Sequence, residues 1–151
     1  MNDILKEDLI SECLHILSGK EQGLKSEIAQ LRDGIANDSK SSMGDKYETS
    51  REMSQQEINR LEQQQALIKQ QVFQLKNIPT NINPNKINVG SLVQTSIGYF
   101  FIATALPQIT LDGATVFGVS PQAPIGVQFM GKKAGDCIQV NAITYKIDSV
   151  F

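Results

Sequence analysis

The stretch Ser41-Ser42-Met43-Gly44-Asp45-Lys46-Tyr47-Glu48 decides the fold, because it interrupts a heptad-patterned segment at its midpoint. Apolar residues recur at spacings of three and four on both sides, from about Asp3 to Asn77. That spacing is typical of helices that pack along a coiled-coil seam. Small and polar residues replace it between Asn37 and Gly44. Two helices joined by a short polar turn form an antiparallel hairpin, so this stretch is predicted to be its tip.

The first helix is predicted to run from an N-cap at Asp3 to about Ala36. Its predicted seam consists of Ile10, Leu14, Leu17, Leu24, Ile28, Leu31 and Ile35, with Glu21 in one core position. The second helix has two possible starts, since both Asp45 with Glu48 and Thr49 with Glu52 fit a capping box. Its predicted seam consists of Ile58, Leu61, Ile68, Val72 and Leu75, with Gln65 in the remaining position.

The second half of the chain changes to a strand-like pattern. Residues 78–88 contain two prolines and four asparagines, which predict a linker. Short strands are then expected at 91–95, 99–106, 109–111, 114–119, 137–140 and 144–150, with a type I′ turn at Asp112-Gly113. A short helix is expected at 124–130, with proline in its first turn, and a turn at 131–136. The expected fold class is α+β: a helical hairpin (1–77), a linker (78–88) and a small antiparallel sheet domain (89–151).

Composition excludes several classes of function. Residues 1–77 hold ten Lys or Arg against thirteen Asp or Glu, and residues 78–151 hold four Lys against three Asp. Neither half has the basic footprint of an autonomous nucleic-acid binder, so any such role would run through a protein partner. The single histidine, His15, makes a Ser/His/Asp triad or a histidine zinc site improbable.

Cysteine usage and hydropathy predict a cytoplasmic location. Cys13 and Cys137 lie in different halves and form no CxxC pair, which favours reduced thiols. The charged start lacks the apolar region of a signal peptide, and no run approaches the ~20 apolar residues that span a bilayer.

Asp45 and Glu48 are the candidate functional residues of the tip. Carboxylates three positions apart at a helix start are typical of capping. The same oxygens can bind a hard cation such as Mg²⁺. The two roles are compatible, and the local sequence leaves both open.

Two patches resemble the bacterial Gre transcript-cleavage factors (GreA and GreB). Gly44-Asp45-Lys46-Tyr47-Glu48 is similar to the Gly-Asp-Leu-x-Glu of that family's hairpin tip. The segment from Pro124 to Asp136, Pro-Ile-Gly-Val-Gln-Phe-Met-Gly-Lys-Lys-Ala-Gly-Asp, is similar to Pro-Leu-Gly-x-Ala-Leu-Leu-Gly-Lys-Lys-x-Gly-Asp. The order of hairpin, linker and sheet domain also matches.

The resemblance implies a transcription elongation factor with an FKBP-like second domain. Its hairpin would enter the secondary channel of RNA polymerase, where Asp45 and Glu48 would share Mg²⁺ with the polymerase's own acids. Pro124, Ile125 and Gly126 would help to dock the sheet domain on the polymerase exterior. A factor of this kind is not itself an enzyme, holds no stable cofactor, meets RNA only at its 3′ end within the polymerase complex, and is expected to be a monomer without membrane contact.

The sequence also departs from the family pattern. Thr49-Ser50-Arg51-Glu52 stands where the family has Asn-Ala-Glu-Tyr. Ala123 replaces the serine before the proline, and Ser120-Pro121 offers a competing register for that pair. Two other functions therefore stay open: a channel regulator that does not stimulate cleavage, and a coiled-coil adaptor.

Overall fold

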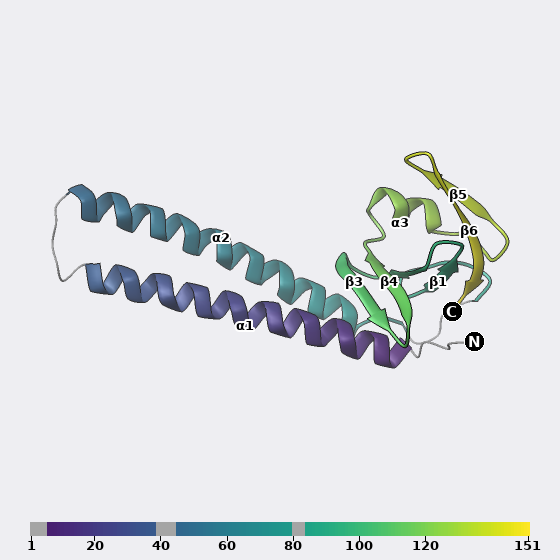
Figure 1. Ribbon diagram of the computed structural model, residues 1–151, viewed down its shortest axis with the longest axis horizontal. Coiled ribbons are helices and arrows are strands. Elements are labelled where there is room, and N and C mark those ends of the chain that lie inside the picture. The colour runs from purple at the N-terminus through teal and green to yellow at the C-terminus, as the bar shows by residue number, and fades with distance from the viewer. Residues whose placement is uncertain (1–5, 39–44, 80–83) are drawn as a thin grey trace. The chain divides into compact units, whose positions relative to one another are not determined.

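The computed structural model describes residues 6–38, 45–79 and 84–151 (Figure 1). Two long helices come first, α1 (Lys6–Asp38) and α2 (Asp45–Lys76). The predicted pair of helices is confirmed, and α2 begins at the earlier of its two predicted starts. The predicted N-cap at Asp3 and the turn at 39–44 lie outside the described residues.

The chain forms two compact units. One comprises Leu14–Val72 and is called here the helical unit. The other comprises Met1–Cys13 together with Phe73–Phe151 and is called the sheet unit. The sheet unit therefore includes the beginning of α1 and the end of α2.

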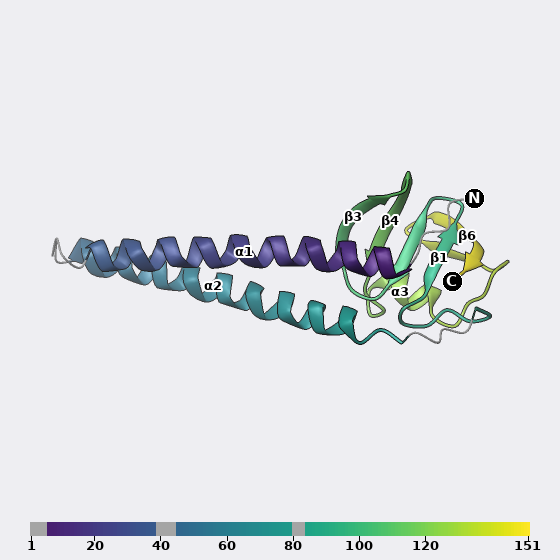
Figure 2. The ribbon, with the colours of Figure 1, turned by 90° about the horizontal axis from the view of Figure 1, so that it is seen from below.

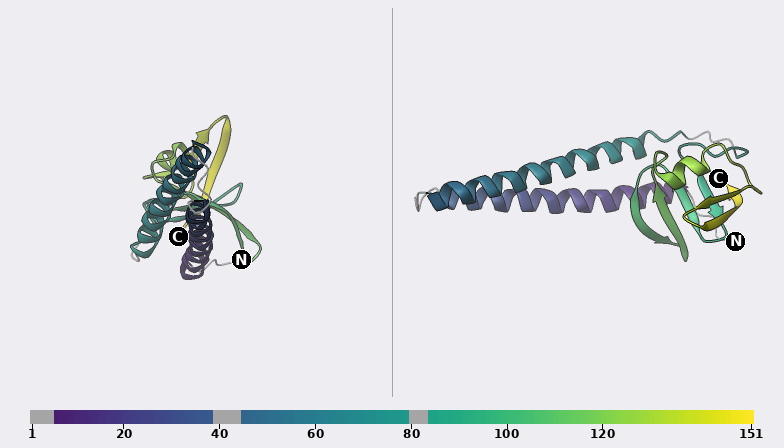
Figure 3. Two further views of the ribbon diagram at one scale, coloured as in Figure 1. Left: turned by 90° about the vertical axis from the view of Figure 1, so that its left-hand side faces the viewer. Right: turned by 90° about the horizontal axis from the view of Figure 1, so that it is seen from above.

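The helical unit is held together by the predicted seam. Ile28, Ile58 and Leu61 are buried in one cluster, against which Leu24, Leu31 and Ile35 pack. Burying a Leu or Ile side chain contributes roughly 1.5–3 kcal/mol, so this stripe is the main stabilising element of the unit. α1 and α2 lie side by side in both Figure 2 and the right panel of Figure 3.

The predicted seam is wrong at the start of α1. Leu9 and Cys13 are fully buried, whereas Ile10 and Leu14 are only half-buried. The reason is that Leu9 and Cys13 belong to the sheet unit, so this end of the helix does not follow the heptad register of the hairpin. In this region, Leu17 is the one residue that was correctly predicted to be buried.

Six strands form one sheet in the order β3-β4-β2-β1-β6-β5. Their bounds are β1 Leu92–Thr95, β2 Tyr99–Ile102, β3 Leu106–Leu111, β4 Ala114–Val119, β5 Cys137–Val140 and β6 Ile143–Val150. The expected antiparallel sheet is corrected to a mixed one, because β2 pairs in parallel with β4, with Phe100 opposite Phe117. The predicted Asp112-Gly113 hairpin turn is confirmed, with φ of 51° and 80°.

The strand expected at 99–106 ends early, at Ile102. Residues 103–105 instead carry the chain from β2 to β3, which pairs with the far side of β4. This connection passes close to β4: a β-carbon on Gly118 would lie 2.7 Å from the β-carbon of Leu106 and 2.9 Å from the carbonyl oxygen of Thr104. Glycine at 118 permits that crossing.

The short helix α3 (Pro124–Phe129) contributes to the core of the sheet. Its Phe129 is buried with Phe100, and their ring centroids are 5.2 Å apart. Tyr145 packs edge-on against Phe100 at 5.5 Å. The remaining buried members of this cluster are Ile87, Val93, Ile102, Val119, Ile138, Ile147 and Val150.

The central strands are buried on both faces. Leu92, Phe101 and Ala103 alternate with the members of the aromatic cluster and are themselves buried. The same unit contains the fully buried Leu9 and Cys13 of α1 and the buried Leu75 of α2. A strand buried on both faces reads as a continuous apolar run, which is why Tyr99 to Ile102 shows no alternation.

Ile87, expected in the linker, belongs to the core of the sheet unit. It is fully buried, its N–H donates to the carbonyl of Lys132 at 2.8 Å, and its carbonyl accepts from Gly131 N–H at 2.9 Å. Ile87 therefore ties the chain before β1 to the turn after α3. Residues 80–83 of the predicted linker lie outside the described residues.

Candidate functional sites

The first candidate site is the beginning of α2. Asp45 is the first residue of the helix, and Glu48 lies three residues further on with its side chain exposed. The side chain of Asp45 lies outside the described part of the chain. Asp45 and Glu48 are both residues of the first helical turn, and acidic residues are favoured there by the helix dipole.

The described residues around these acids form no complete metal site. Among the described residues, no three His, Cys, Asp or Glu side chains are grouped so that they could hold a metal ion. Mg²⁺ prefers six oxygen ligands and is commonly held by one or two carboxylates plus water and phosphate. Two carboxylates supply fewer than these six ligands.

The second candidate site is α3 with the turns on either side of it. Pro124 is the first residue of α3, so the helix uses Pro124 and not Pro121 as its starting proline. Ala123 takes the N-cap position with φ −66° and ψ 153°, and no side chain caps the helix. Ser120-Pro121, the alternative match to the family's Ser-Pro pair, does not begin this helix. Ser120 instead begins a tight turn, in which its carbonyl accepts a hydrogen bond from Ala123 N–H at 3.1 Å.

The three predicted docking residues lie in different environments. Pro124 is exposed, Ile125 is half-buried against the aromatic cluster, and Gly126 is buried. A β-carbon on Gly126 would collide with the carbonyl oxygen of Ser120, so the glycine allows α3 to pack against the Ser120 turn. Of these three residues, only Pro124 and Ile125 can offer side chains to a partner. Val127, which the prediction omitted, is 56% exposed on the same helix.

The turn after α3 is held by hydrogen bonds that match its sequence. Gly131 and Gly135 have φ of 81° and 95°, in the region that favours glycine. Asp136 accepts from Lys133 N–H through its carboxylate at 3.0 Å, and its own N–H donates to the Lys133 carbonyl at 3.1 Å. The side chains of Lys132 and Lys133 are exposed beside α3.

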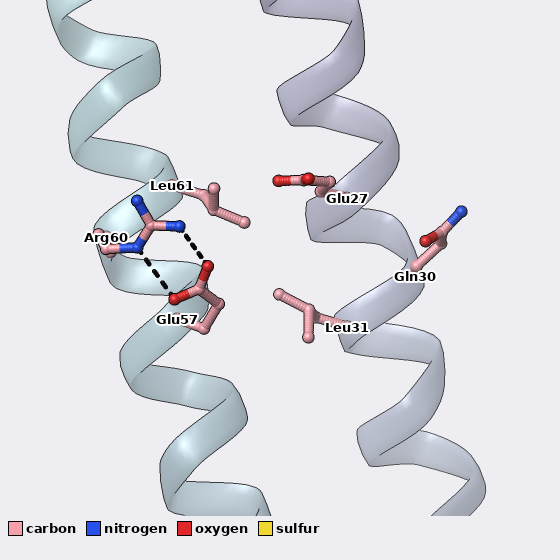
Figure 4. Close-up of a pocket in the computed structure, with 6 residues that line it drawn as sticks. All are labelled: Glu27, Gln30, Leu31, Glu57, Arg60 and Leu61. Atoms are coloured by element: carbon pink, nitrogen blue, oxygen red, sulfur yellow. Dashed lines mark hydrogen bonds and ion pairs between the residues drawn. The ribbon is translucent and has the colours of Figure 1, made fainter.

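The third feature is a groove along the helical unit, which the sequence analysis did not single out. Glu27, Gln30 and Leu31 of α1 and Glu57, Arg60 and Leu61 of α2 line a hollow of about 330 Å³. In Figure 4, Leu31 and Leu61 point into the space between the helices, while Arg60 is bonded to Glu57 on α2. The sequence feature that could have located this groove is the set of heptad positions on either side of the predicted seam.

A comparison with models of known protein families finds no match, and a search of curated proteins finds none either. Among the described helices, none is both long and apolar enough to cross a membrane.

Proposed function

We propose that this chain is a transcription factor of the Gre type, which binds RNA polymerase and stimulates the polymerase's own Mg²⁺-dependent cleavage of backtracked RNA. The observation that carries the proposal is the position of the two acids. α2 starts at Asp45 and exposes Glu48 in its first turn, at one end of a pair of packed antiparallel helices. A helix of 32 residues spans about 48 Å at 1.5 Å per residue, which suits a probe that reaches into a channel.

The order of elements from Pro124 to Asp136 gives independent support. The second family-like patch consists of a short helix that starts with proline, a glycine-containing turn whose backbone bonds to Asp136, and the following strand β5. These elements follow one another in the order expected from the patch. The FKBP-like identity of the sheet unit is part of the proposal. In it, Pro124, Ile125 and the exposed Val127 form the docking surface, and Gly126 acts by allowing α3 to pack.

In the proposed mechanism this chain positions charge and does not carry out the reaction alone. Asp45 and Glu48 would add carboxylate oxygens to the acids of the polymerase, since two carboxylates are too few to hold Mg²⁺ firmly. When bound, the metal lowers the pKa of water and stabilises the charge that develops at the phosphodiester. The protein would act as a monomer whose contact with RNA is limited to the 3′ end inside the complex.

The experiment is cleavage of labelled RNA in a stalled, backtracked complex of the cognate polymerase with Mg²⁺. We expect Asp45→Ala and Glu48→Ala to lose cleavage while polymerase binding, measured separately, stays intact. Glu52→Gln is the matched control, since it removes one charge from an exposed position one turn further along α2. Equal loss in the control would indicate that general acidity, and not a defined pair of ligands, is responsible.

The docking surface has its own test. Val127→Asp should weaken polymerase binding, and Ile97→Asp, an equivalent change at a 51% exposed residue in the β1–β2 turn, should not. Absence of binding by the unchanged protein would overturn the proposal as a whole.

A second candidate is a channel regulator that binds without stimulating cleavage. The observation that favours it is that Thr49, Ser50, Arg51 and Glu52, where the family pattern differs, are all exposed on the first turns of α2. Binding without cleavage in wild type would select this function. The remaining candidate, a coiled-coil adaptor, would bind other helices and leave the polymerase unaffected.

A further inference from the structure

One face of the helical unit carries a continuous groove between α1 and α2, here called the shaft groove. The hollow lined by Glu27 and Arg60 adjoins a second of about 350 Å³, lined by Lys20, Gly23, Leu24, Glu27, Gln64 and Ile68. Glu27 lines both, so the two hollows form one groove. Its floor is the apolar seam, since Leu24, Leu31 and Leu61 also pack in or against the buried cluster.

Beyond the residues that line the two hollows, α2 exposes two apolar side chains, Met53 and Leu67, each seven residues from Arg60. Met53, Arg60 and Leu67 follow one another at intervals of seven residues, which keeps them on one face of a packed helix. Met53 is 67% exposed and Leu67 is 56% exposed. Arg60, between them, is hydrogen-bonded through Nε to Glu57 at 2.9 Å.

The α1 wall presents complementary features at the same interval. Gly34, Glu27 and Lys20 are also spaced by seven residues. Glu27 and Arg60 line the same hollow and the helices are antiparallel, so Gly34 lies level with Met53, and Lys20 lies level with Leu67. A β-carbon on Gly34 would meet no atom within 4 Å, so α1 leaves open space at this position, level with Met53 of α2.

The charges of the groove are also arranged in a complementary way. The hydrogen bond and charge of Glu57 raise the pKa of Arg60, and Glu27 on the opposite wall raises it further. Glu27 and Arg60 therefore oppose each other across the groove. The opposite face of the hairpin differs, because there Arg32 bridges directly to Glu62 at 3.0 Å across the helices.

We propose that the shaft groove is a self-association surface that takes a second copy of this chain, with the two hairpins parallel and groove facing groove. A two-fold axis along the hairpins then sets α1 of each copy against α2 of the other. In this arrangement Met53 meets Gly34 of the second copy, Arg60 meets Glu27, and Leu67 lies against the aliphatic stem of Lys20. The result is a four-helix bundle. Its contact between copies uses helix positions that lie next to the apolar seam within each copy.

Charge decides between the two possible groove-to-groove arrangements. An antiparallel pair with its two-fold axis level with Glu27 and Arg60 would set α1 against α1 and α2 against α2, which brings Arg60 against Arg60 and Glu27 against Glu27. Like charges at a contact are destabilising, whereas the parallel pair alternates their signs. The self-association goes beyond the proposed function, and the copy that binds polymerase would be the monomer.

Sedimentation velocity of the full chain over a series of concentrations, without polymerase, tests the proposal. We expect a reversible monomer–dimer equilibrium whose association constant falls about tenfold or more in Gly34→Leu, since a leucine at this position would fill the space that Met53 of the second copy takes in the proposed dimer. Gly19→Leu is the matched control, because Gly19 also has open space around it and does not belong to the series Gly34, Glu27 and Lys20 that is spaced by seven residues. Far-ultraviolet circular dichroism verifies that both variants keep their helices.

A charge exchange separates this interface from nonspecific association. Glu27→Arg should weaken the dimer, and Glu27→Arg combined with Arg60→Glu should restore most of the affinity. Disulfide formation checks the geometry in a Cys137→Ser background: a mixture of Met53→Cys and Gly34→Cys proteins should cross-link between copies, and a mixture of Met53→Cys and Gly19→Cys proteins should not.

A chain that remains monomeric at the highest attainable concentration overturns the proposal and leaves the groove to a helix of a different protein. A dimer that is indifferent to Gly34→Leu, or equally weakened by Gly19→Leu, overturns it as well. None of these outcomes depends on polymerase binding, so they are independent of the tests of the proposed function.

Discussion

The carbonyl oxygen of Ser120 occupies the space that a β-carbon on Gly126 would need, and the Cα of Pro121 lies 3.1 Å from the same position. The atoms in the way are backbone atoms of a hydrogen-bonded turn, so they cannot move aside as a flexible side chain could. Gly126 is thus a structural requirement of the α3 surface. Its place in the family-like patch follows from this packing.

Gly126→Ala should lower the free energy of unfolding of the sheet unit by about 1–3 kcal/mol, because the added methyl group must displace α3 or the Ser120 turn. Urea unfolding followed by tyrosine fluorescence measures the change. Gly19→Ala is the control. It adds the same methyl group where nothing lies within 4 Å and should stabilise α1 by up to about 1 kcal/mol through its higher helix propensity. An unchanged midpoint for Gly126→Ala would show that the turn can relax.

The two roles proposed for Asp45, capping and metal binding, can be separated with asparagine. Asparagine caps a helix about as well as aspartate but has no carboxylate. Asp45→Asn should therefore keep the stability of wild type and lose cleavage, whereas Asp45→Ala should lose cleavage and also about 1 kcal/mol of stability. Thermal unfolding and the RNA cleavage assay give the two measurements. Cleavage retained in Asp45→Asn would identify the residue as a cap only.

The stability of the helical unit should depend on its seam far more than on its surface ion pairs. Leu61→Ala removes a 2% exposed side chain and should cost about 2–5 kcal/mol. Arg32→Ala, which breaks the exposed bridge to Glu62, should cost less than about 1 kcal/mol. Leu67→Ala, at a 56% exposed position on the same helix, is the control for loss of leucine and should be nearly neutral at low protein concentration. Chemical unfolding monitored by helical circular dichroism ranks the three.

The two thiols should react very differently. Cys13 is fully buried and Cys137 is exposed, so a water-soluble alkylating reagent should modify Cys137 rapidly and Cys13 only after unfolding. Mass spectrometry of a time course counts the modified sites. Equally rapid modification of both would mean that the start of α1 detaches from the sheet unit.

Burial, together with the nearby charge of Glu12, raises the pKa of the Cys13 thiol from 9.0 to about 11. The unfolded chain loses this proton near pH 9 and the folded chain holds it until about pH 11, so the folded state binds more protons in that window. The free energy of unfolding should therefore fall as pH rises from 9 to 11, by on the order of 1 kcal/mol after allowance for solvent screening. Urea unfolding of wild type and Cys13→Ala across this range isolates the effect, because the variant lacks the titrating group.

The sequence predicted the elements whose determinants are local. The spacing of Ile58, Leu61 and Ile68 was sufficient to predict the seam of α2, because the helical period alone selects its buried face. The Asp112-Gly113 turn was predictable for a similar reason, since two adjacent residues supply the required φ angles.

The features that the sequence did not predict depend on contacts between distant segments. The parallel pairing of Phe100 with Phe117 has no local signature, because a strand buried on both faces gives the same apolar run in either sheet type. Ile87 was expected in the linker and Leu9 was left out of the predicted seam, but both are buried by packing within the sheet unit. The tip acids remain a prediction from spacing and resemblance, whereas the groove around Glu27 required the arrangement of both helices.

The pairing of β1 with β6 has a consequence for the order of folding. Val93 lies opposite Val150, so the second partner of a central strand comes from the last residues of the sequence, and β5 pairs with β6 as well. The cluster around Ile28, Ile58 and Leu61 needs no residue beyond the helices. During synthesis the hairpin can therefore assemble while the sheet still waits for its final strand, since contacts between distant segments form late. The apolar strands β1 and β2 would remain without their full set of partners until residues 143–150 had been made, and that interval is when the nascent chain is most exposed to aggregation.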